Sequence, residues 1–152
     1  MSLRDDFTAQ LKTAMLAKDA PRVSAMRMIT ARLKDVDIAA RPKGIAAVPD
    51  EEVIAMLRGM VKSRHESAVL YRQGGRAELA AKEESEIAVI EAFLPQQMDD
   101  DAMAAAVAAA IAETGATGIK EMGRVMAALR AAHGPVLDMG KAGPLVKAKL
   151  GG

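Results

Sequence analysis

The stretch KSRHESAVLYRQGGRAELAAKEESEIAVIEAFLP, residues 62–95, has the pattern of two helices joined by a tight turn. Apolar residues recur three and four positions apart on both sides of Gly74-Gly75, which is the spacing of one helix face. Glycine tolerates the left-handed conformation that ends a helix, and Pro95 cannot continue one. We therefore expect a long antiparallel hairpin over about residues 51–93.

Three charged residues fall within the apolar stripes of this hairpin. Arg64 lies on the apolar face of the first helix, and Glu83 and Glu86 lie on that of the second. Counting outward from the glycines brings Arg64 level with residues 83–87. Because an arginine on a core face is costly without a carboxylate, we predict a structural ion pair from Arg64 to Glu83 or Glu86. Its expected role is to fix the register of the hairpin.

The other cations of the first helix fall on the side opposite the apolar stripe. They are Arg58, Lys62, Arg72 and Arg76, accompanied by His65. The pattern leaves open whether this stripe is a solvated face or a surface for anions. Tyr71 comes level with Leu79 near the turn, where we expect a half-buried packing residue.

Beyond the hairpin, capping residues, prolines and glycines delimit further helices and no strand. The composition agrees, since the chain is rich in Ala and Met and only 2% aromatic. We predict an all-α protein with an N-terminal domain of about four helices, residues 1–95, and a C-terminal three-helix domain, residues 99–152. The expected helices span about residues 3–18, 21–39, 51–73, 77–93, 100–113, 118–132 and 139–150.

Bulk properties restrict the function without naming it. The chain has 152 residues, 51% of them hydrophobic and none of them Cys, so disulfides and cysteine-based sites are excluded. The net charge of +1 conceals an uneven distribution of charged residues along the chain. The formal charge is +5 over residues 1–76, −7 over residues 77–101 and +3 over residues 102–152. The start lacks the pattern of a signal peptide, and no apolar run reaches the roughly 20 residues of a membrane span. We expect a cytoplasmic protein with no membrane association.

No catalytic motif is present. The sequence lacks the P-loop, dinucleotide-binding, zinc-protease and nucleophile-elbow patterns. The run Asp99-Asp100-Asp101 could hold a cation but is more typical of a helix N-terminus, and ETGATG, residues 113–118, is more typical of a helix connection than of a phosphate loop. We expect no catalytic residue, no metal and no cofactor.

The residues around the hairpin resemble the YqeY-like (GatB/YqeY) family. That family's pattern has K-x-R-x-E-S, an aromatic residue, G-R, L-A-x-x-E and a leucine-proline followed by glutamine. A later segment with Met-Gly-Arg-Val-Met, residues 122–126, and the terminal DMGKAGPLVKAKL also match, whereas Gly74 and Pro144 are small departures. The matching residues of the hairpin region are Lys62, Arg64, Glu66, Ser67, Tyr71, Gly75, Arg76, Leu79, Ala80, Glu83, Leu94, Pro95 and Gln97.

The resemblance implies a helical N-terminal part and a C-terminal domain similar to the tail of the GatB subunit of glutamine-dependent tRNA amidotransferase. In that enzyme the tail contacts tRNA while amide transfer occurs in another domain. Family labels often carry carbon–nitrogen ligase activity with glutamine as amido donor. Because this chain has the tail and not the catalytic domain, the resemblance does not extend to catalysis.

Three functions are weighed, the last of them a stand-alone amidotransferase, for which we expect no activity. The first is a non-catalytic accessory module that binds tRNA or another folded RNA with modest affinity. The alternative is a protein–protein adaptor for an aminoacyl-tRNA synthetase or an amidotransferase. The expected nucleic-acid-binding residues are Lys120, Arg124, Arg130, Lys141 and Lys147, with Lys120 and Arg124 on one exposed face of the same helix.

Overall fold

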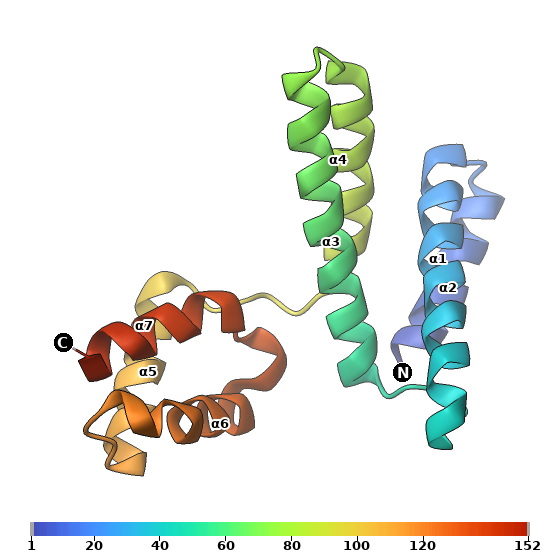
Figure 1. Ribbon diagram of the computed structural model, residues 1–152. Coiled ribbons are helices and arrows are strands. Elements are labelled where there is room, and N and C mark those ends of the chain that lie inside the picture. The colour runs from blue at the N-terminus through green and yellow to red at the C-terminus, as the bar shows by residue number, and fades with distance from the viewer. Residues whose placement is uncertain (1, 152) are drawn as a thin grey trace. The chain divides into compact units, whose positions relative to one another are not determined.

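The computed structural model describes residues 2–151, and within that range the chain folds into seven α-helices and no strand. The predicted all-α fold is confirmed. The chain divides into two compact units, the first ending at Leu94 and the second beginning at Pro95. The helices, shown in Figure 1, are α1 (Leu3–Leu16), α2 (Ala20–Ala40), α3 (Asp50–Gln73), α4 (Ala77–Glu91), α5 (Asp100–Thr114), α6 (Met122–His133) and α7 (Met139–Gly151).

The N-terminal unit begins with two helices whose starts are fixed by polar side chains. Ser2 and Asp5 form a reciprocal capping box at α1, and the Asp19 side chain accepts a hydrogen bond from the Arg22 amide at the start of α2. We expected the first helix to reach residue 18, but α1 ends at Leu16. Lys18 adopts a φ of 56°, which turns the chain so that Asp19 can cap the next helix.

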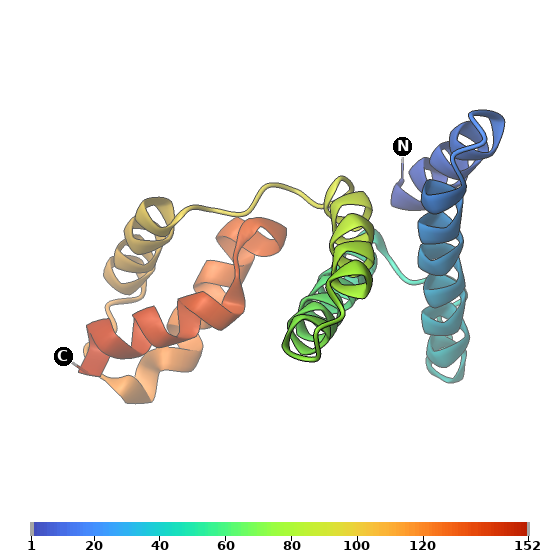
Figure 2. The same ribbon diagram turned by 90° about the horizontal axis from the view of Figure 1, so that it is seen from above.

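Helices α3 and α4 lie side by side as an antiparallel hairpin (Figures 1 and 2). Gly75 has a φ of 73°, a left-handed conformation that suits glycine and turns the chain between the helices. The Arg76 amide then donates to the Tyr71 carbonyl over 2.7 Å, which closes the end of α3. Helix α4 ends at Glu91, two residues earlier than predicted, because the chain tightens into three-residue turns before Pro95.

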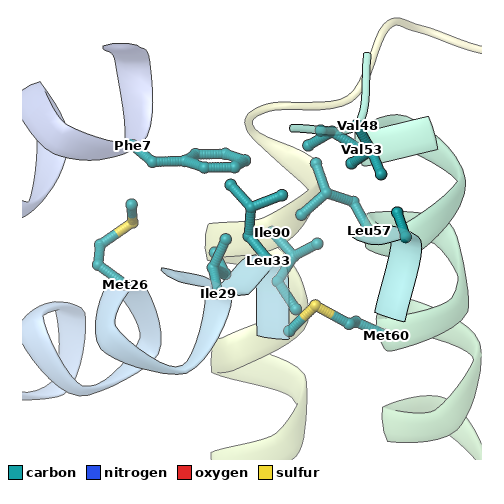
Figure 3. Packing of buried hydrophobic residues seen from close by; sticks show 10 residues of the cluster. Phe7, Met26, Ile29, Leu33, Val48, Val53, Leu57, Met60 and Ile90 are labelled. Atoms are coloured by element: carbon teal, nitrogen blue, oxygen red, sulfur yellow. The ribbon is translucent and has the colours of Figure 1, made fainter. Parts of the chain in front are cut away.

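One apolar core joins all four helices of this unit. Phe7 of α1 is buried, and its ring meets that of Phe93 edge to face with centroids 4.9 Å apart. Aliphatic and methionine side chains from the other helices complete the core. Figure 3 shows Phe7 with Met26, Ile29, Leu33, Val48, Val53, Leu57, Met60 and Ile90.

The C-terminal unit packs α5, α6 and α7 around a second core that is rich in alanine. Asp99 caps α5 by accepting from the Ala102 amide over 2.7 Å, and Gly115 ends that helix with a φ of 66°. The helix expected from residue 118 begins instead at Met122. A 3-10 turn, η2 (Ile119–Glu121), precedes it and brings the chain back toward α5.

Candidate functional site

The Arg64 guanidinium lies between three helices of the N-terminal unit. Its Nε is 3.3 Å from Oε2 of Glu86 and 4.0 Å from Oε2 of Glu83, so the structure brings together the three residues expected in the hairpin seam. Nη1 donates to the Met60 carbonyl, and Nη2 contacts the Met28 sulfur of α2. The Arg64 side chain is only 15% exposed. Its planar head therefore ties α3 and α4 together and reaches α2.

A second ion pair in this unit escaped the sequence analysis. Arg4 of α1 donates through Nη1 and Nη2 to both carboxylate oxygens of Asp37 in α2, each over 2.7 Å. Arg4 also donates to the Val48 carbonyl over 2.9 Å, while the Val48 amide donates to Asp37 over 2.9 Å. These bonds tie α1, α2 and the loop before α3 together. No local pattern could reveal them, because Arg4 and Asp37 are 33 residues apart.

The bonds in this network shift the acid–base properties of its members. The hydrogen bonds from Arg4 and from the Val48 amide lower the pKa of Asp37 from 3.8 to about 2. The Asp37 carboxylate in turn raises the pKa of Arg4. Both pKa shifts reflect stabilisation of the charged forms, as expected for a structural ion pair. Neither Arg4 nor Asp37 is therefore suited to act as a general acid or a general base near neutral pH.

The outer cations of α3 do not form a uniform positive stripe. Arg72 pairs with Glu84 of α4 over 2.6 Å at the exposed surface, and Arg58 is half-buried. Lys62, His65 and Arg76 are exposed. The carboxylate of Glu84 offsets one of the charges that an anion surface would need, which favours the solvated-face interpretation.

In the C-terminal unit the expected nucleic-acid-binding residues occupy three elements. Lys120 lies on η2 and not on the α6 helix, so the expectation that it shares one helix with Arg124 is wrong. Arg124 is turned toward the protein, since Nη2 donates to the Thr114 carbonyl over 2.9 Å and to Glu121 over 2.5 Å. Its role is therefore in part structural, closing the end of α5, although the side chain stays 59% exposed. The exposed cations of this unit include Lys120, Arg130, Lys141, Lys147 and Lys149.

A shallow hollow of about 500 Å³ lies between η2 and the last two turns of α7. Ile119, which is half exposed, forms one side, and Pro144, Lys147 and Ala148 of α7 form the other. A Cβ placed on Gly151 would lie 3.0 Å from Cδ1 of Ile119, so η2 packs directly against the end of α7. This contact places the turn that carries Lys120 beside the helix face that carries Lys147.

The remaining candidates for chemistry have structural roles. Asp99, the first of the three consecutive aspartates, caps α5. Across residues 2–151, no group of three or more His, Cys, Asp or Glu side chains is arranged to hold a metal ion. His133 lies half-buried at the end of α6, next to Gly134. The segment ETGATG joins α5 to α6.

No single helix in the described part of the chain is long and apolar enough to cross a membrane. The segments Asp100–Thr114 and Ile119–Val136 meet the length and composition criteria only when taken together, and they are bent by 94° at the break between them. Their buried residues, among them Met103, Val107 and Leu129, form the core of the C-terminal unit.

Comparison with known proteins assigns nearly the whole length of the chain to one family. No curated protein matched the sequence. Among protein families, residues 4–150 match the one described as Yqey-like protein. That range includes the hairpin with Arg64, the segment before Pro95 and all three helices of the C-terminal unit. The chain therefore belongs to the YqeY-like family.

Proposed function

We propose that this protein is a non-catalytic accessory module that binds tRNA or another folded RNA through its C-terminal unit. The observation that carries the proposal is the exposed side of α7 and η2. There Lys147 lines a shallow hollow together with Ile119, Pro144, Ala148 and Gly151, and Lys120 and Lys141 are exposed on the same two elements. Small side chains let a phosphate backbone approach the helix closely, and flanking lysines supply the charge that it needs.

The distribution of aromatic residues defines the kind of RNA that this surface suits. The Phe and Tyr residues, Phe7, Tyr71 and Phe93, all belong to the N-terminal unit and the chain has no Trp, so the half-buried His133 supplies the one aromatic ring of the C-terminal unit on which an unpaired base could stack. Recognition would then use phosphates and the shape of folded RNA, with affinity that falls steeply as salt rises. Arg130 adds a further exposed cation on α6.

Fluorescence titration of bulk tRNA with the full chain tests this proposal. The Lys120→Glu/Lys147→Glu double variant should weaken binding by about tenfold or more and reduce the slope of log Kd against log salt by about two. A matched control, Lys12→Glu/Lys34→Glu, makes the same charge change at exposed positions of the N-terminal unit and should bind more nearly like the wild type. Equal weakening by both variants would show only a net-charge effect and would reject the site.

A second candidate function is an adaptor for a synthetase or an amidotransferase. The tip of the α3–α4 hairpin favours it, because Val69 and Leu70 are 54% and 67% exposed there. Affinity capture with the full chain, before and after nuclease digestion, separates this function from RNA binding. An adaptor retains its synthetase or amidotransferase after digestion, and a Val69→Ser/Leu70→Ser variant should release it.

We propose that the protein acts in the cytoplasm, without a membrane and without an activity of its own. The shifted pKa values belong to capping and ion-pair residues, so they indicate no general acid or base. An assay for glutamine-dependent amide formation on misacylated tRNA should give the rate of the enzyme-free control. A rate above that control would instead support the carbon–nitrogen ligase activity with which the family is labelled.

A further inference from the structure

A groove of about 500 Å³ runs between α2 and α3 in the N-terminal unit, whereas the surface proposed for RNA belongs to the C-terminal unit. Three methionines line it, Met28 from α2 and Met56 and Met60 from α3. Methionine side chains are flexible and polarisable, so they adapt to an apolar side chain inserted among them. The groove therefore offers a deformable apolar surface along two helices.

The α3 side of the groove includes a row of small residues beside its methionines. Ala55, Gly59 and Ser63 all line it, and they are spaced four residues apart along the helix. Gly59 lies in the middle of a helix of 24 residues, where glycine costs about 1 kcal/mol relative to alanine. A Cβ placed on Gly59 would meet no atom of the chain within 4 Å. Packing within the protein thus gives no reason for the glycine, whereas close approach by another molecule does.

Both charged residues that line the groove are arginines. Arg32 on α2 is exposed, and Arg64 on α3 is held in place by Glu86 while its outer nitrogen contacts the Met28 sulfur. No carboxylate lines the groove. Two acids of α3, Glu52 and Glu66, lie seven residues before and after Gly59 on nearly the same helix face, beyond the ends of the groove. Because Glu86 and Glu83 of α4 compensate the charge of Arg64, the exposed guanidinium of Arg32 is the positive charge that the groove offers to an acidic partner.

We propose that this groove binds an acidic amphipathic helix of a partner protein. The apolar side chains of that helix would enter among the methionines, its backbone would approach Gly59, and an Asp or Glu residue would pair with Arg32. This inference goes beyond RNA binding and gives the adaptor candidate a surface and a partner chemistry. It is tested separately from both, because its residues lie neither in the C-terminal unit nor at the hairpin tip.

Binding of synthetic helical peptides to the full chain tests whether the groove prefers an acidic partner. The probe is a fluorescein-labelled peptide of about 18 residues, or five turns, with leucines on one face and glutamates flanking them. A sibling peptide carries lysines in place of the glutamates. Fluorescence anisotropy should show the acidic peptide binding about tenfold or more tightly than the basic one. Equal affinity for the two peptides, or no binding of the acidic one, would overturn the proposal.

Substitutions in the groove test the location. Gly59→Leu should fill the groove and weaken the acidic peptide about tenfold or more, and Arg32→Glu should weaken it severalfold. Gly123→Leu is the matched control, because Gly123 is also an exposed helical glycine with no neighbour within 4 Å of a Cβ, but it lies on α6. Lys34→Glu on α2 controls for charge. Circular dichroism melts check that each variant folds, and equal effects of Gly59→Leu and Gly123→Leu would reject the groove.

Two other occupants of the groove, a second copy of the chain and RNA, can be distinguished from an acidic helix. Sedimentation of the chain alone would reveal a second copy as the occupant, if a dimer formed and Gly59→Leu abolished it. Displacement of the bound acidic peptide by bulk tRNA would assign the groove to RNA. Either result would overturn the proposal, whereas a monomeric chain whose peptide complex resists tRNA supports it.

Discussion

The two units of this protein are both bundles of helices, yet their interiors differ. The main cluster of the N-terminal core is built from large side chains, with one alanine, Ala40, and an aromatic pair at Phe7 and Phe93, and the other buried alanines of the unit lie outside that cluster. In the C-terminal core, four of ten buried cluster residues are alanines, namely Ala106, Ala110, Ala116 and Ala142. Small side chains let helices approach closely but bury less apolar area per residue. The two units should therefore respond differently to the same kind of substitution.

The ion pairs of the two units also differ. In the N-terminal unit, ion pairs connect separate helices, as Arg64 does with Glu86 and Arg4 with Asp37. The ion pair described for the C-terminal unit, Arg124 with Glu121, joins residues three apart. Charged pairs between helices specify which faces meet, whereas a local pair only supports a turn. The N-terminal unit thus depends on electrostatics in a way that the C-terminal unit does not.

The largest expected effect comes from removing an aromatic ring. Phe7→Ala leaves a cavity in a core of large side chains and should lower the free energy of unfolding of the N-terminal unit by about 3–5 kcal/mol. Hydrogen exchange with mass spectrometry, read separately for residues 2–94 and 95–151, measures this change. Leu129→Ala is the counterpart in the C-terminal unit. Equal loss of protection in both units after either change would refute the comparison.

Loss of the Arg64 side chain should have the next largest effect. Arg64→Ala strands Glu86 in a mostly buried seam and should cost about 2–3 kcal/mol in the N-terminal unit, less than a fully buried pair because the site retains some exposure. The Arg64→Met/Glu86→Leu double variant should recover most of that loss in urea unfolding. If the double variant recovered no stability, Arg64 would stabilise the seam by packing and not by compensating the charge of Glu86.

The Asp37 network predicts acid sensitivity confined to the N-terminal unit. The folded-state pKa of Asp37 lies near 2, below its ordinary 3.8. Its contribution is therefore complete above about pH 5 and is lost as the pH falls through 2, and for such a shift it amounts to about 2 kcal/mol. Asp37→Asn should show that deficit at pH 7 and only a small part of it near pH 2 in denaturant titrations. A deficit that does not change with pH would contradict the assignment.

The smallest expected effect is a gain in stability. Gly59→Ala adds a Cβ where the chain leaves open space and should stabilise the N-terminal unit by about 0.5–1 kcal/mol, because alanine favours the helix. Gly123→Ala should do the same for the C-terminal unit. Thermal melts monitored by hydrogen exchange distinguish the two. A loss of stability at position 59 would show that the backbone there needs glycine.

Much of the fold could be predicted because its signals are local. The turn at Gly74-Gly75 and the cap at Asp99 follow from the conformations that these residues adopt. The meeting of Arg64 with Glu86 could be anticipated as well, since a tight hairpin fixes the register of its two helices by counting from the turn. Local sequence was therefore enough to predict the structure where a short connection between two helices fixes how they pack.

The rest depended on contacts between distant segments. The Arg4–Asp37–Val48 network needs the packing of α1 against α2 before its members meet. The 3-10 turn that carries Lys120 differs from an α-helix by one residue in its hydrogen bonding, which a pattern of three residues cannot reveal. Arg124 donates to the Thr114 carbonyl across ten residues, a contact that depends on how the connection between α5 and α6 folds.

The boundary after Leu94 also matters for how the protein is made. Every side chain of the N-terminal core, up to the last partly buried one at Leu94, precedes Pro95 in the chain. A ribosome therefore finishes the complete set of residues for one bundle before it begins the other. The first unit can fold during translation while the second is still inside the exit tunnel, so its apolar surface is covered before the alanine-rich helices emerge.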